Sequence, residues 1–339
     1  MLNGFYHMVQ DRLHKRFWIF SDLQQVLPHM AEECLRIALE DMADKKDRID
    51  QIWYLGDAME GKNPERVAEM VDMQVRLLTD FGVPVRFIMG NHDLDLTSNA
   101  PAGTPPILPV YDAFRNVPGW RTTDTFTDFY FTETFGDTLV VFLSDHVAPD
   151  NRWFATQQGL RGPDPEAYAH APSAYDQLRE QMTAWQGPVI LAGHYAFPGG
   201  ARGAPPDGLL NRLLPLPDNV KLVLHGHAHT GDWPYGKEKT FQRLGWIDWH
   251  PVPQANISSL DRTRGSQTRS AVLDLYQDGT LGLYFRDHED QMWSDAFYVN
   301  TRAPRTTSEA NARHHGKHTS FEGTALETWK RQHNRPDHE

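Results

Sequence analysis

Five short apolar runs lie in the first two thirds of the chain, and each is followed by a turn that contains Asp, Asn or His. The runs are residues 17–20, 52–55, 85–89, 189–192 and 220–224, and they end at Ser21-Asp22, Gly56-Asp57, Gly90-Asn91, Gly193-His194 and His225-Gly226-His227. Short runs of β-branched and aromatic residues that stop at turn residues predict buried strands. Ligands of α/β sheets bind outside the carboxyl ends of the strands, so we expect these polar side chains to gather at one sheet edge.

The last of these endings is the hexapeptide Leu224-His225-Gly226-His227-Ala228-His229, which carries two imidazoles at positions i and i+2 across a Gly. In an extended segment such side chains point to the same side, so both rings can face one point in space. Neutral imidazole is the commonest metal ligand among side chains. The hexapeptide therefore indicates a metal site, with a polar loop after a strand as the alternative.

Two helical patterns separate the first three runs. In the second pattern, Asn63-Pro64 is a good N-cap and first-turn pair, and Gly82 stops the apolar stripe. The first pattern is carried by Ala31, Cys34, Leu35, Ala38 and Met42. Strand, helix, strand, helix and strand in this order predict parallel strands with helices packed on the sheet.

The part of the chain between residues 256 and 300 is predicted to be β-rich. Residues 270–275 and 281–285 flank Asp278-Gly279, which predicts a hairpin, and residues 297–299 are expected to form the last strand. Strands after a βαβ region indicate a second sheet packed on the first. We therefore expect one catalytic domain over residues 1–300, followed by a polar tail, rich in His and Arg, over residues 301–339 that is partly disordered or docks as a helix.

Composition limits the function classes. The chain has 339 residues and a formal net charge of −12, which works against binding to nucleic-acid phosphates. A small phosphorylated substrate is compatible with this charge, because metal ions can supply local positive charge. The single Cys34 fits a reducing compartment, and neither a signal peptide nor a membrane-spanning run is evident, so a cytoplasmic enzyme that does not contact membranes is expected. The sequence indicates no oligomeric state.

Three stretches rich in Pro and Gly, residues 99–120, 147–172 and 197–206, read as long loops. The first could wall a substrate pocket or run over the surface. The third contains Arg202, which could bind a substrate phosphate in bidentate fashion, although most loop arginines are simply solvated. Ser144-Asp145-His146 ends another strand-like run and is interpreted as supporting or lining the pocket.

The residue types suit the chemistry that hydrolysis of a phosphoester requires. Two divalent ions roughly 3.5–4 Å apart can activate a water and stabilise charge on the attacking and leaving oxygens. Holding two cations that close requires an anionic bridge, which a carboxylate with two oxygens can provide. Asp57, central in the series, is the candidate bridge.

The series resembles the calcineurin-like metallophosphoesterase family over roughly residues 17 to 300. That family carries Asp-x-His, Gly-Asp, Gly-Asn-His-(Asp/Glu), Gly-His and Gly-His-x-His in this order. The chain has Asp22-Leu23-Gln24, Gly56-Asp57, Gly90-Asn91-His92-Asp93, Gly193-His194 and Gly226-His227-Ala228-His229. The resemblance implies an α/β fold in which a two-sheet sandwich is flanked by helices in four layers. Gln24 is the one departure from the pattern.

The resemblance also implies a role for each residue of these blocks. One metal ion would bind to Asp22, Gln24, Asp57 and His229, and the other to Asp57, Asn91, His194 and His227. Asn91 would also lie beside the substrate. His92 would not bind metal but would protonate or stabilise the leaving oxygen, and Asp93 would orient its ring.

Gln24 bears on the identity of the metal. An amide oxygen is a harder donor than imidazole nitrogen and suits Mn²⁺ or Mg²⁺ better than Zn²⁺. We therefore expect weaker binding at the first position and Mn²⁺ as the preferred ion, with Fe, Zn²⁺ and Mg²⁺ as alternatives. The Asp-x-Gln variation resembles a branch of the family that cleaves pyrophosphate linkages with Mn²⁺. Alternatively, Gln24 only hydrogen-bonds to a ligand, and one metal ion binds tightly.

The function that these features favour is metal-dependent hydrolysis of a phosphodiester or pyrophosphate bond in a small, soluble, nucleotide-like substrate. The alternatives are a phosphomonoesterase or a nuclease of the same family, and a protein that binds metal as a scaffold without catalysis. The net charge argues against a nuclease. The retained His92 argues against a scaffold, because a scaffold needs no proton donor beside the metal.

Overall fold

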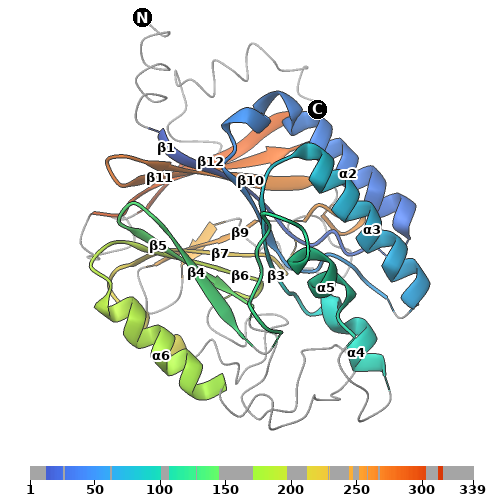
Figure 1. Cartoon of the computed structure of the whole chain (residues 1–339). Coiled ribbons are helices and arrows are strands. Elements are labelled where there is room, and N and C mark those ends of the chain that lie inside the picture. The colour runs from blue at the N-terminus through green and yellow to red at the C-terminus, as the bar shows by residue number, and fades with distance from the viewer. Residues whose placement is uncertain are drawn as a thin grey trace, which may run out of the picture.

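The computed structural model describes most of the chain as two packed β-sheets with helices on their outer faces (Figure 1). The described residues are 13–25, 27–61, 63–100, 107–126, 128–144, 171–196, 212–227, 229, 244–246, 252–257, 259–265, 268–302 and 312–315. This arrangement confirms the predicted α/β sandwich flanked by helices.

The first sheet has seven strands in the order β13-β12-β11-β10-β1-β2-β3. Its strands are β1 (Leu13–Phe20), β2 (Gln51–Leu55), β3 (Val85–Ile88), β10 (Arg269–Tyr276), β11 (Thr280–Asp287), β12 (Met292–Asn300) and β13 (Ala312–His315). The strands β1, β2 and β3 run parallel, whereas β10 to β13 continue the sheet in antiparallel fashion from the other edge of β1. The carboxyl ends of β1, β2 and β3 therefore lie side by side.

The second sheet has six strands in the order β4-β5-β6-β7-β9-β8. They are β4 (Tyr130–Phe135), β5 (Thr138–Leu143), β6 (Val189–Gly193), β7 (Val220–His225), β8 (Leu244–Trp246) and β9 (Pro253–Asn256). The strands β5, β6, β7 and β9 are parallel neighbours. Their carboxyl ends form a second row of strand ends opposite those of the first sheet.

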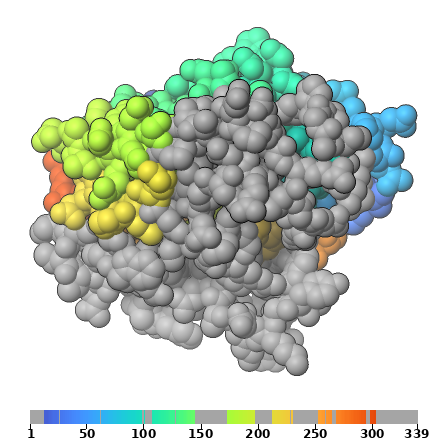
Figure 2. Space-filling model, turned by 90° about the horizontal axis from the view of Figure 1, so that it is seen from below, coloured from blue at the N-terminus to red at the C-terminus, as the bar shows by residue number. Residues whose placement is uncertain are grey.

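Helices cover both outer faces. They are α2 (Pro28–Met42), η1 (Ala43–Arg48), α3 (Pro64–Phe81), η2 (His92–Leu94), α4 (Asp95–Asn99), α5 (Pro109–Arg115), α6 (Ala171–Ala184) and α7 (Arg262–Gly265). As predicted, Asn63 caps α3 by accepting a hydrogen bond from the backbone N–H of Arg66, and Gly82 ends the helix with a φ of 83°. In the view from below, α6 and α3 lie at opposite sides of the molecule (Figure 2).

Strand residues alternate between two apolar layers. Phe17 and Ile19 of β1 point between the sheets, where Phe17 stacks on Trp53 with ring centroids 4.3 Å apart. Trp18 and Phe20 point to the other side and pack with residues of α2 and α3. Burying each large apolar side chain contributes about 1.5–3 kcal/mol, so β1 is fixed from both faces.

Three expectations about secondary structure were wrong. The strands over residues 269–300 do not form a second sheet but extend the first one, because β10 pairs with β1. The stretch 99–120 is not one long loop, because residues 109–115 form α5, whose Val110, Tyr111 and Phe114 are buried. Residues 297–299 are not in the last strand, since β13 pairs with β12 further along the chain. The division of the chain at residue 300 stays a prediction. Among the described residues, no helix is both long enough and apolar enough to cross a lipid bilayer.

Candidate metal centre

The loops after β1, β2, β3, β6 and β7 meet at one end of the sandwich. Two contacts across the sheets show this directly. Nε2 of His194, after β6, lies 3.2 Å from Oδ2 of Asp57, after β2. Nε2 of His229, after β7, lies 3.1 Å from Oδ1 of Asp22, after β1. These contacts bring together side chains that we expected, from their positions after the strands, to converge at one edge.

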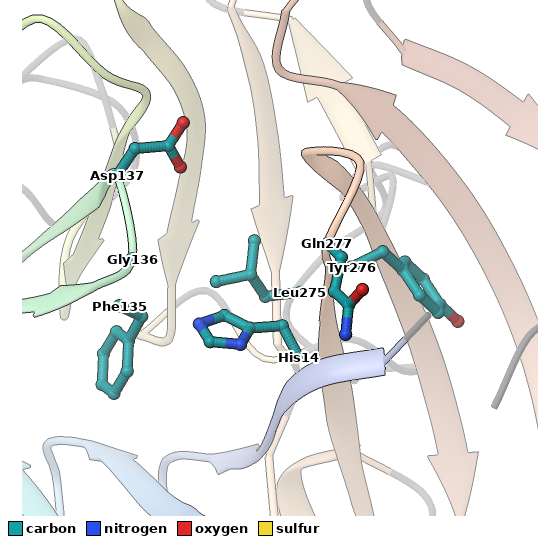
Figure 3. A pocket seen from close by; sticks show the side chains of 7 residues that line it. All are labelled: His14, Phe135, Gly136, Asp137, Leu275, Tyr276 and Gln277. Carbon is teal, nitrogen blue, oxygen red and sulfur yellow. The ribbon is translucent and has the colours of Figure 1, made fainter. Parts of the chain in front are cut away.

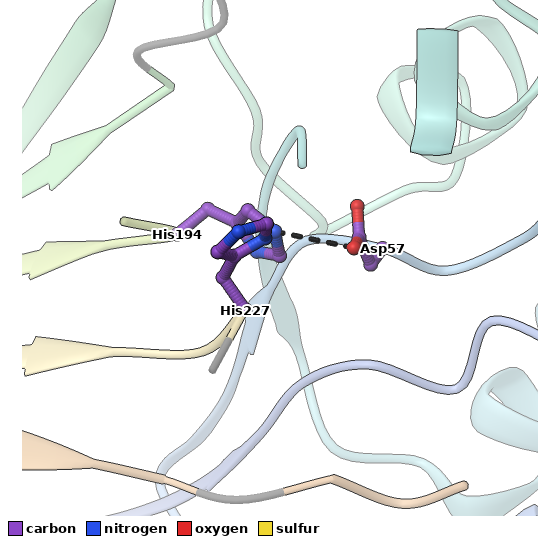
Figure 4. Close-up of side chains that lie close together, drawn as sticks. All are labelled: Asp57, His194 and His227. Carbon is purple, nitrogen blue, oxygen red and sulfur yellow. Dashed lines mark ion pairs between the residues drawn. The ribbon is translucent and has the colours of Figure 1, made fainter. Parts of the chain in front are cut away.

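Around Asp57, three potential metal ligands form a compact group. One ligand atom from each of Asp57, His194 and His227 lies within 4.8 Å of the others. The two imidazoles lie next to each other on the same side of Asp57 (Figure 4). Oδ1 of Asn91 lies 3.3 Å from Nε2 of His194 and adds an amide oxygen to the group. Two imidazoles, a carboxylate and an amide oxygen suit a divalent transition-metal ion.

A second group forms around Asp22. Its carboxylate contacts His229, and Nε2 of Gln24 lies 3.2 Å from Nε2 of the same histidine. Rotating the Gln24 amide by half a turn would present its oxygen at the same place, because the two ends of an amide have nearly the same shape. Asp22 and Gln24 are 0% and 2% exposed, so the group is closed to bulk water from their side.

The ligand side chains are held from behind by backbone groups. Nδ1 of His194 lies 2.7 Å from the carbonyl oxygen of Leu55, which accepts its hydrogen and leaves Nε2 as the ligand nitrogen. The backbone N–H of His227 donates to Oδ2 of Asp22 at 2.9 Å. The N–H of His92 donates to Oδ1 of Asp57 at 2.8 Å. Each of these contacts fixes one atom of a ligand and directs another toward the centre.

The backbone at the centre adopts a left-handed conformation that favours glycine. Among the described residues, five positions other than glycine have positive φ, and the centre contains four of them: Asp22, Asp57, His227 and His229. Such residues cost about 1–3 kcal/mol each and cluster at functional sites. Glycines make room around them. A Cβ on Gly90 would lie 2.2 Å from Oδ1 of Asp57, and one on Gly226 would lie 2.6 Å from Oδ2 of Asp22.

The buried carboxylates of the centre require a positive charge nearby. Burial opposes ionisation of Asp57, yet the charges on His194 and His92 hold its pKa well below the usual range. Burial lowers the pKa of His194, but Asp57 outweighs it and raises that pKa to about 10. Burial and His194 lower the pKa of His227 to about 3. Without metal, a protonated His194 balances the buried carboxylates. A divalent cation would take over this task, so the residues present fit a metal ion.

The residue that contacts the ring of His92 differs from the one expected. Nδ1 of His92 lies 3.0 Å from Oδ2 of Asp95, so Asp95 and not Asp93 orients the imidazole. Asp93 instead accepts backbone hydrogen bonds from Asp57, Ala58 and Gly90. The sequence signal for Asp95 was its spacing, since side chains three residues apart meet on a helical turn.

The remaining sequence predictions divide into two kinds. Arg202, Asp145 and His146 lie outside the described residues. Ser144 is fully buried, and its Oγ accepts a hydrogen bond from the backbone N–H of Met89 at 3.0 Å, so it supports the end of β3. Sequence reasoning missed Tyr195, whose ring packs edge-on against His194 and His227 with centroids 5.1 and 4.8 Å away.

A separate pocket of about 220 Å³ lies beside the beginning of β1, and Figure 3 shows the side chains that line it. It is lined by His14 near the start of β1 and by residues around the turns after β4 and β10, including Asp137 and Tyr276. The metal-ligand side chains follow the carboxyl ends of the strands, whereas this pocket lies where β1 begins. It therefore belongs to a different part of the molecule from the centre.

One comparison with known protein families agrees with this geometry. The family model described as calcineurin-like phosphoesterase matches residues 15–231. A search of curated protein sequences gives no significant match.

Solved structures similar to the chain include a purple acid phosphatase from yellow lupin (Lupinus luteus), with a TM-score of 0.49 and 12% identity over 86% of this chain and 57% of that one. Others are the calcineurin-like phosphoesterase YfkN from Bacillus subtilis (TM-score 0.43, 10% identity, 78% of this chain and 85% of that one) and the sulfate thiohydrolase SoxB from Thermus thermophilus (TM-score 0.41, 12% identity, 81% and 56%). The chain thus spans just over half the length of the lupin phosphatase.

Proposed function

Because the chain belongs to the calcineurin-like phosphoesterase family, we propose that it hydrolyses phosphoester bonds with the help of two divalent metal ions. The observation that carries this proposal is that Asp57 shares a compact ligand group with His194 and His227 and also lies close enough to Asp22 for the two charges to repel each other. Its Oδ2 lies 3.2 Å from Nε2 of His194, and its other oxygen is held by the N–H of His92. A carboxylate with both oxygens so placed suits a bridge between two cations.

The proposed ligand sets follow the two groups. Asp57 would contact both ions. One ion would be held in addition by Asp22, Gln24 and His229, and the other by Asn91, His194 and His227. When bound, such a pair of ions supplies an activated water and stabilises charge on the attacking and leaving oxygens.

His92 is the proposed proton donor to the leaving oxygen. Burial lowers the pKa of His92, but the charge of Asp57 and the hydrogen bond with Asp95 outweigh it and raise that pKa to about 9. In the metal-free protein, the imidazole is therefore protonated at neutral pH. Because Nδ1 is held by Asp95, Nε2 is the nitrogen that would reach the substrate.

We further propose that the substrate is a small, soluble, nucleotide-like molecule and that the bond is a phosphodiester or a pyrophosphate. The described part of the centre contains the carboxylates Asp22, Asp57 and Asp95, and the whole chain has a net charge of −12. A diester or a pyrophosphate linkage carries one negative charge on each phosphorus, whereas a monoester carries up to two. The weaker repulsion favours the former. The buried, free Cys34 supports a reducing, cytoplasmic location.

Mn²⁺ is the proposed ion because of Gln24. Its amide would supply a hard oxygen where the family pattern has imidazole, and this favours Mn²⁺ or Mg²⁺ over Zn²⁺. Its 3.2 Å contact with His229 supports a place beside the first ion. The alternative, in which Gln24 only orients His229, predicts one tightly bound ion instead of two.

The proposal is tested by adding Mn²⁺, Mg²⁺ or Zn²⁺ back to metal-free protein and following three substrates. These are bis-p-nitrophenyl phosphate, p-nitrophenyl phosphate and a dinucleotide joined through pyrophosphate. We expect Mn²⁺-dependent cleavage that favours the diester and the pyrophosphate. Preference for the monoester would assign a phosphomonoesterase instead.

The matched variants for this assay are Asp57→Ala and Asp44→Ala. Asp44 is a largely exposed aspartate of η1 whose side chain is 76% accessible, so its loss should leave turnover unchanged. Asp57→Ala should abolish turnover. Activity of the Asp57 variant within about tenfold of the wild-type value would overturn the two-metal proposal.

A further inference from the structure

Asp93 is a buried carboxylate whose hydrogen bonds all go to the backbone of two metal-binding loops. Its side chain is 1% exposed. Oδ2 accepts the N–H groups of Asp57 and Gly90, at 2.9 and 2.8 Å, and Oδ1 accepts the N–H of Ala58 at 2.8 Å. The loop after β2 and the loop after β3 are thereby joined through one side chain.

The joined segment contains the most constrained part of the centre. Asp57 has a φ of 54°, which costs about 1–3 kcal/mol for a residue other than glycine. Gly90 approaches so closely that a Cβ there would lie 2.5 Å from the backbone nitrogen of Asp57. An ordinary hydrogen bond contributes about 0.5–1.5 kcal/mol, so three of them together can offset the cost of such a conformation.

We propose that Asp93 is a positioning residue that fixes Asp57 in its bridging geometry before any metal ion binds. The inference rests on the metal centre of the proposed function, but it concerns the protein without metal. The carboxylate of Asp93 accepts hydrogen bonds from the backbone N–H groups of Asp57 and Ala58, which flank the Cα of Asp57. The backbone N–H of His92, the residue before Asp93, donates to Oδ1 of Asp57. Residues 92 and 93 therefore hold the backbone of Asp57 and one of its carboxylate oxygens.

Replacing Asp93 with asparagine removes the charge and one acceptor oxygen but keeps the size of the side chain. The amide has one oxygen, which can still accept from Asp57 and Gly90. Its NH₂ group would then face the N–H of Ala58, so two donors would meet where a donor and an acceptor met before. Asp93→Asn should thus release one side of the Asp57 turn while leaving the volume of the site unchanged.

Asp274→Asn is the matched control. Asp274 is also 1% exposed and also accepts three hydrogen bonds, from Nε and Nη2 of Arg16 and from the hydroxyl of Tyr276, but it lies in the middle of β10. Both variants should lower the thermal midpoint of the metal-free protein. Only Asp93→Asn should weaken the binding of Mn²⁺, by about 10–100-fold, as is usual when a residue that orients metal ligands is changed.

The experiment titrates metal-free wild type, Asp93→Asn and Asp274→Asn with Mn²⁺ by calorimetry, without any substrate. Wild type that binds no Mn²⁺ would overturn the proposed function. Wild type that binds Mn²⁺ together with an Asp93→Asn variant of equal affinity would overturn the role of Asp93 alone. Loss of affinity in Asp93→Asn but not in Asp274→Asn supports it.

Hydrogen exchange of the wild-type protein tests the same point if Asp93→Asn does not fold. The proposal expects the peptides that contain Ala58 and Gly90 to be protected in the metal-free protein and to change little when Mg²⁺ or Zn²⁺ is added. Fast exchange of these peptides that slows only after metal addition would mean that the ions, and not Asp93, organise the turn.

Discussion

Nδ1 of His92 lies 3.0 Å from Oδ2 of Asp95, three residues further along the chain. The same oxygen accepts the backbone N–H of Gly61 at 3.0 Å, so the carboxylate is itself held in place. Both side chains are largely buried, with 11% and 15% of their surfaces exposed. The pair therefore keeps Nδ1 of the imidazole engaged and leaves Nε2 for the proton transfer proposed above.

Replacing His92 should slow chemistry more than binding. His92→Asn should lower kcat by about 10²–10⁴-fold, the usual contribution of a general acid, with a smaller change in KM. Asp95→Asn, which keeps His92 but weakens its support, should cost about tenfold. Steady-state kinetics with a p-nitrophenyl diester and an alkyl diester measures both effects.

The choice of leaving group provides the control for this prediction. An alkoxide needs a proton far more than p-nitrophenolate does, so both variants should lose more activity on the alkyl diester. Equal losses on the two substrates would contradict a role for His92 as proton donor.

Changing Gln24 to the residue of the family pattern should change the preferred ion. In Gln24→His, an imidazole replaces the amide beside His229, so preference should move from Mn²⁺ toward Zn²⁺ or Fe. Activity and metal content after equilibration with mixed ions report the shift. An unchanged metal profile would mean that Gln24 does not touch the ion.

Gly90 should tolerate no side chain. A Cβ at this position would meet Oδ1 of Asp57 at 2.2 Å and Cε1 of His194 at 2.8 Å. Gly90→Ala should therefore lower the free energy of unfolding by about 1–3 kcal/mol and abolish binding of both ions. Gly193→Ala, beside His194, is the control, because its Cβ would meet nothing closer than 3.5 Å. Normal metal binding by Gly90→Ala would show that the loops can separate without loss of the site.

A buried ion pair away from the centre should make stability depend on acid pH. Asp41 at the end of α2 accepts hydrogen bonds from Nε of Arg286 at 2.7 Å and from Nδ1 of His288 at 2.8 Å. Burial opposes ionisation, but these partners lower the pKa of Asp41 from 3.8 to about 2. Because the folded-state pKa is depressed, the stabilisation is complete above the unfolded-state pKa and is lost as pH falls toward 2.

Urea unfolding of wild type and Asp41→Asn between pH 5 and pH 3 measures this contribution. The difference in the free energy of unfolding between the two proteins should shrink by about 1 kcal/mol over that range. A constant difference would contradict the depressed pKa.

Much of the fold and of the site could be predicted because local patterns decide them. The runs that became β1, β2, β3, β6 and β7 end where the polar residues begin. Helix α3 begins after Asn63, which caps it, and ends at Gly82, which adopts a left-handed conformation. The convergence of Asp22, Asp57, Asn91 and the three histidines followed from parallel strands that share one edge. Their roles as ligands stay predictions.

What could not be predicted depends on backbone geometry. The left-handed backbone conformation of Asp22, Asp57, His227 and His229 could not be predicted from the sequence, because only glycine is a reliable indicator of that conformation. Asp93 and Asp95 are both carboxylates near His92, and the turn through η2 and α4 decides which one meets the ring. Residues 109–115 became a helix because tertiary packing buries Phe114 despite the surrounding prolines.

The most direct test of the central claim counts the ions and asks whether Asp57 couples them. Metal-free protein is titrated with Mn²⁺ and followed by electron paramagnetic resonance, with Asp57→Ala and Asp44→Ala beside the wild type. We predict two Mn²⁺ per chain with a spin-coupled signal in wild type and in Asp44→Ala, and loss of that coupled signal in Asp57→Ala. A single uncoupled ion in the saturated wild-type protein would contradict a binuclear centre bridged by Asp57.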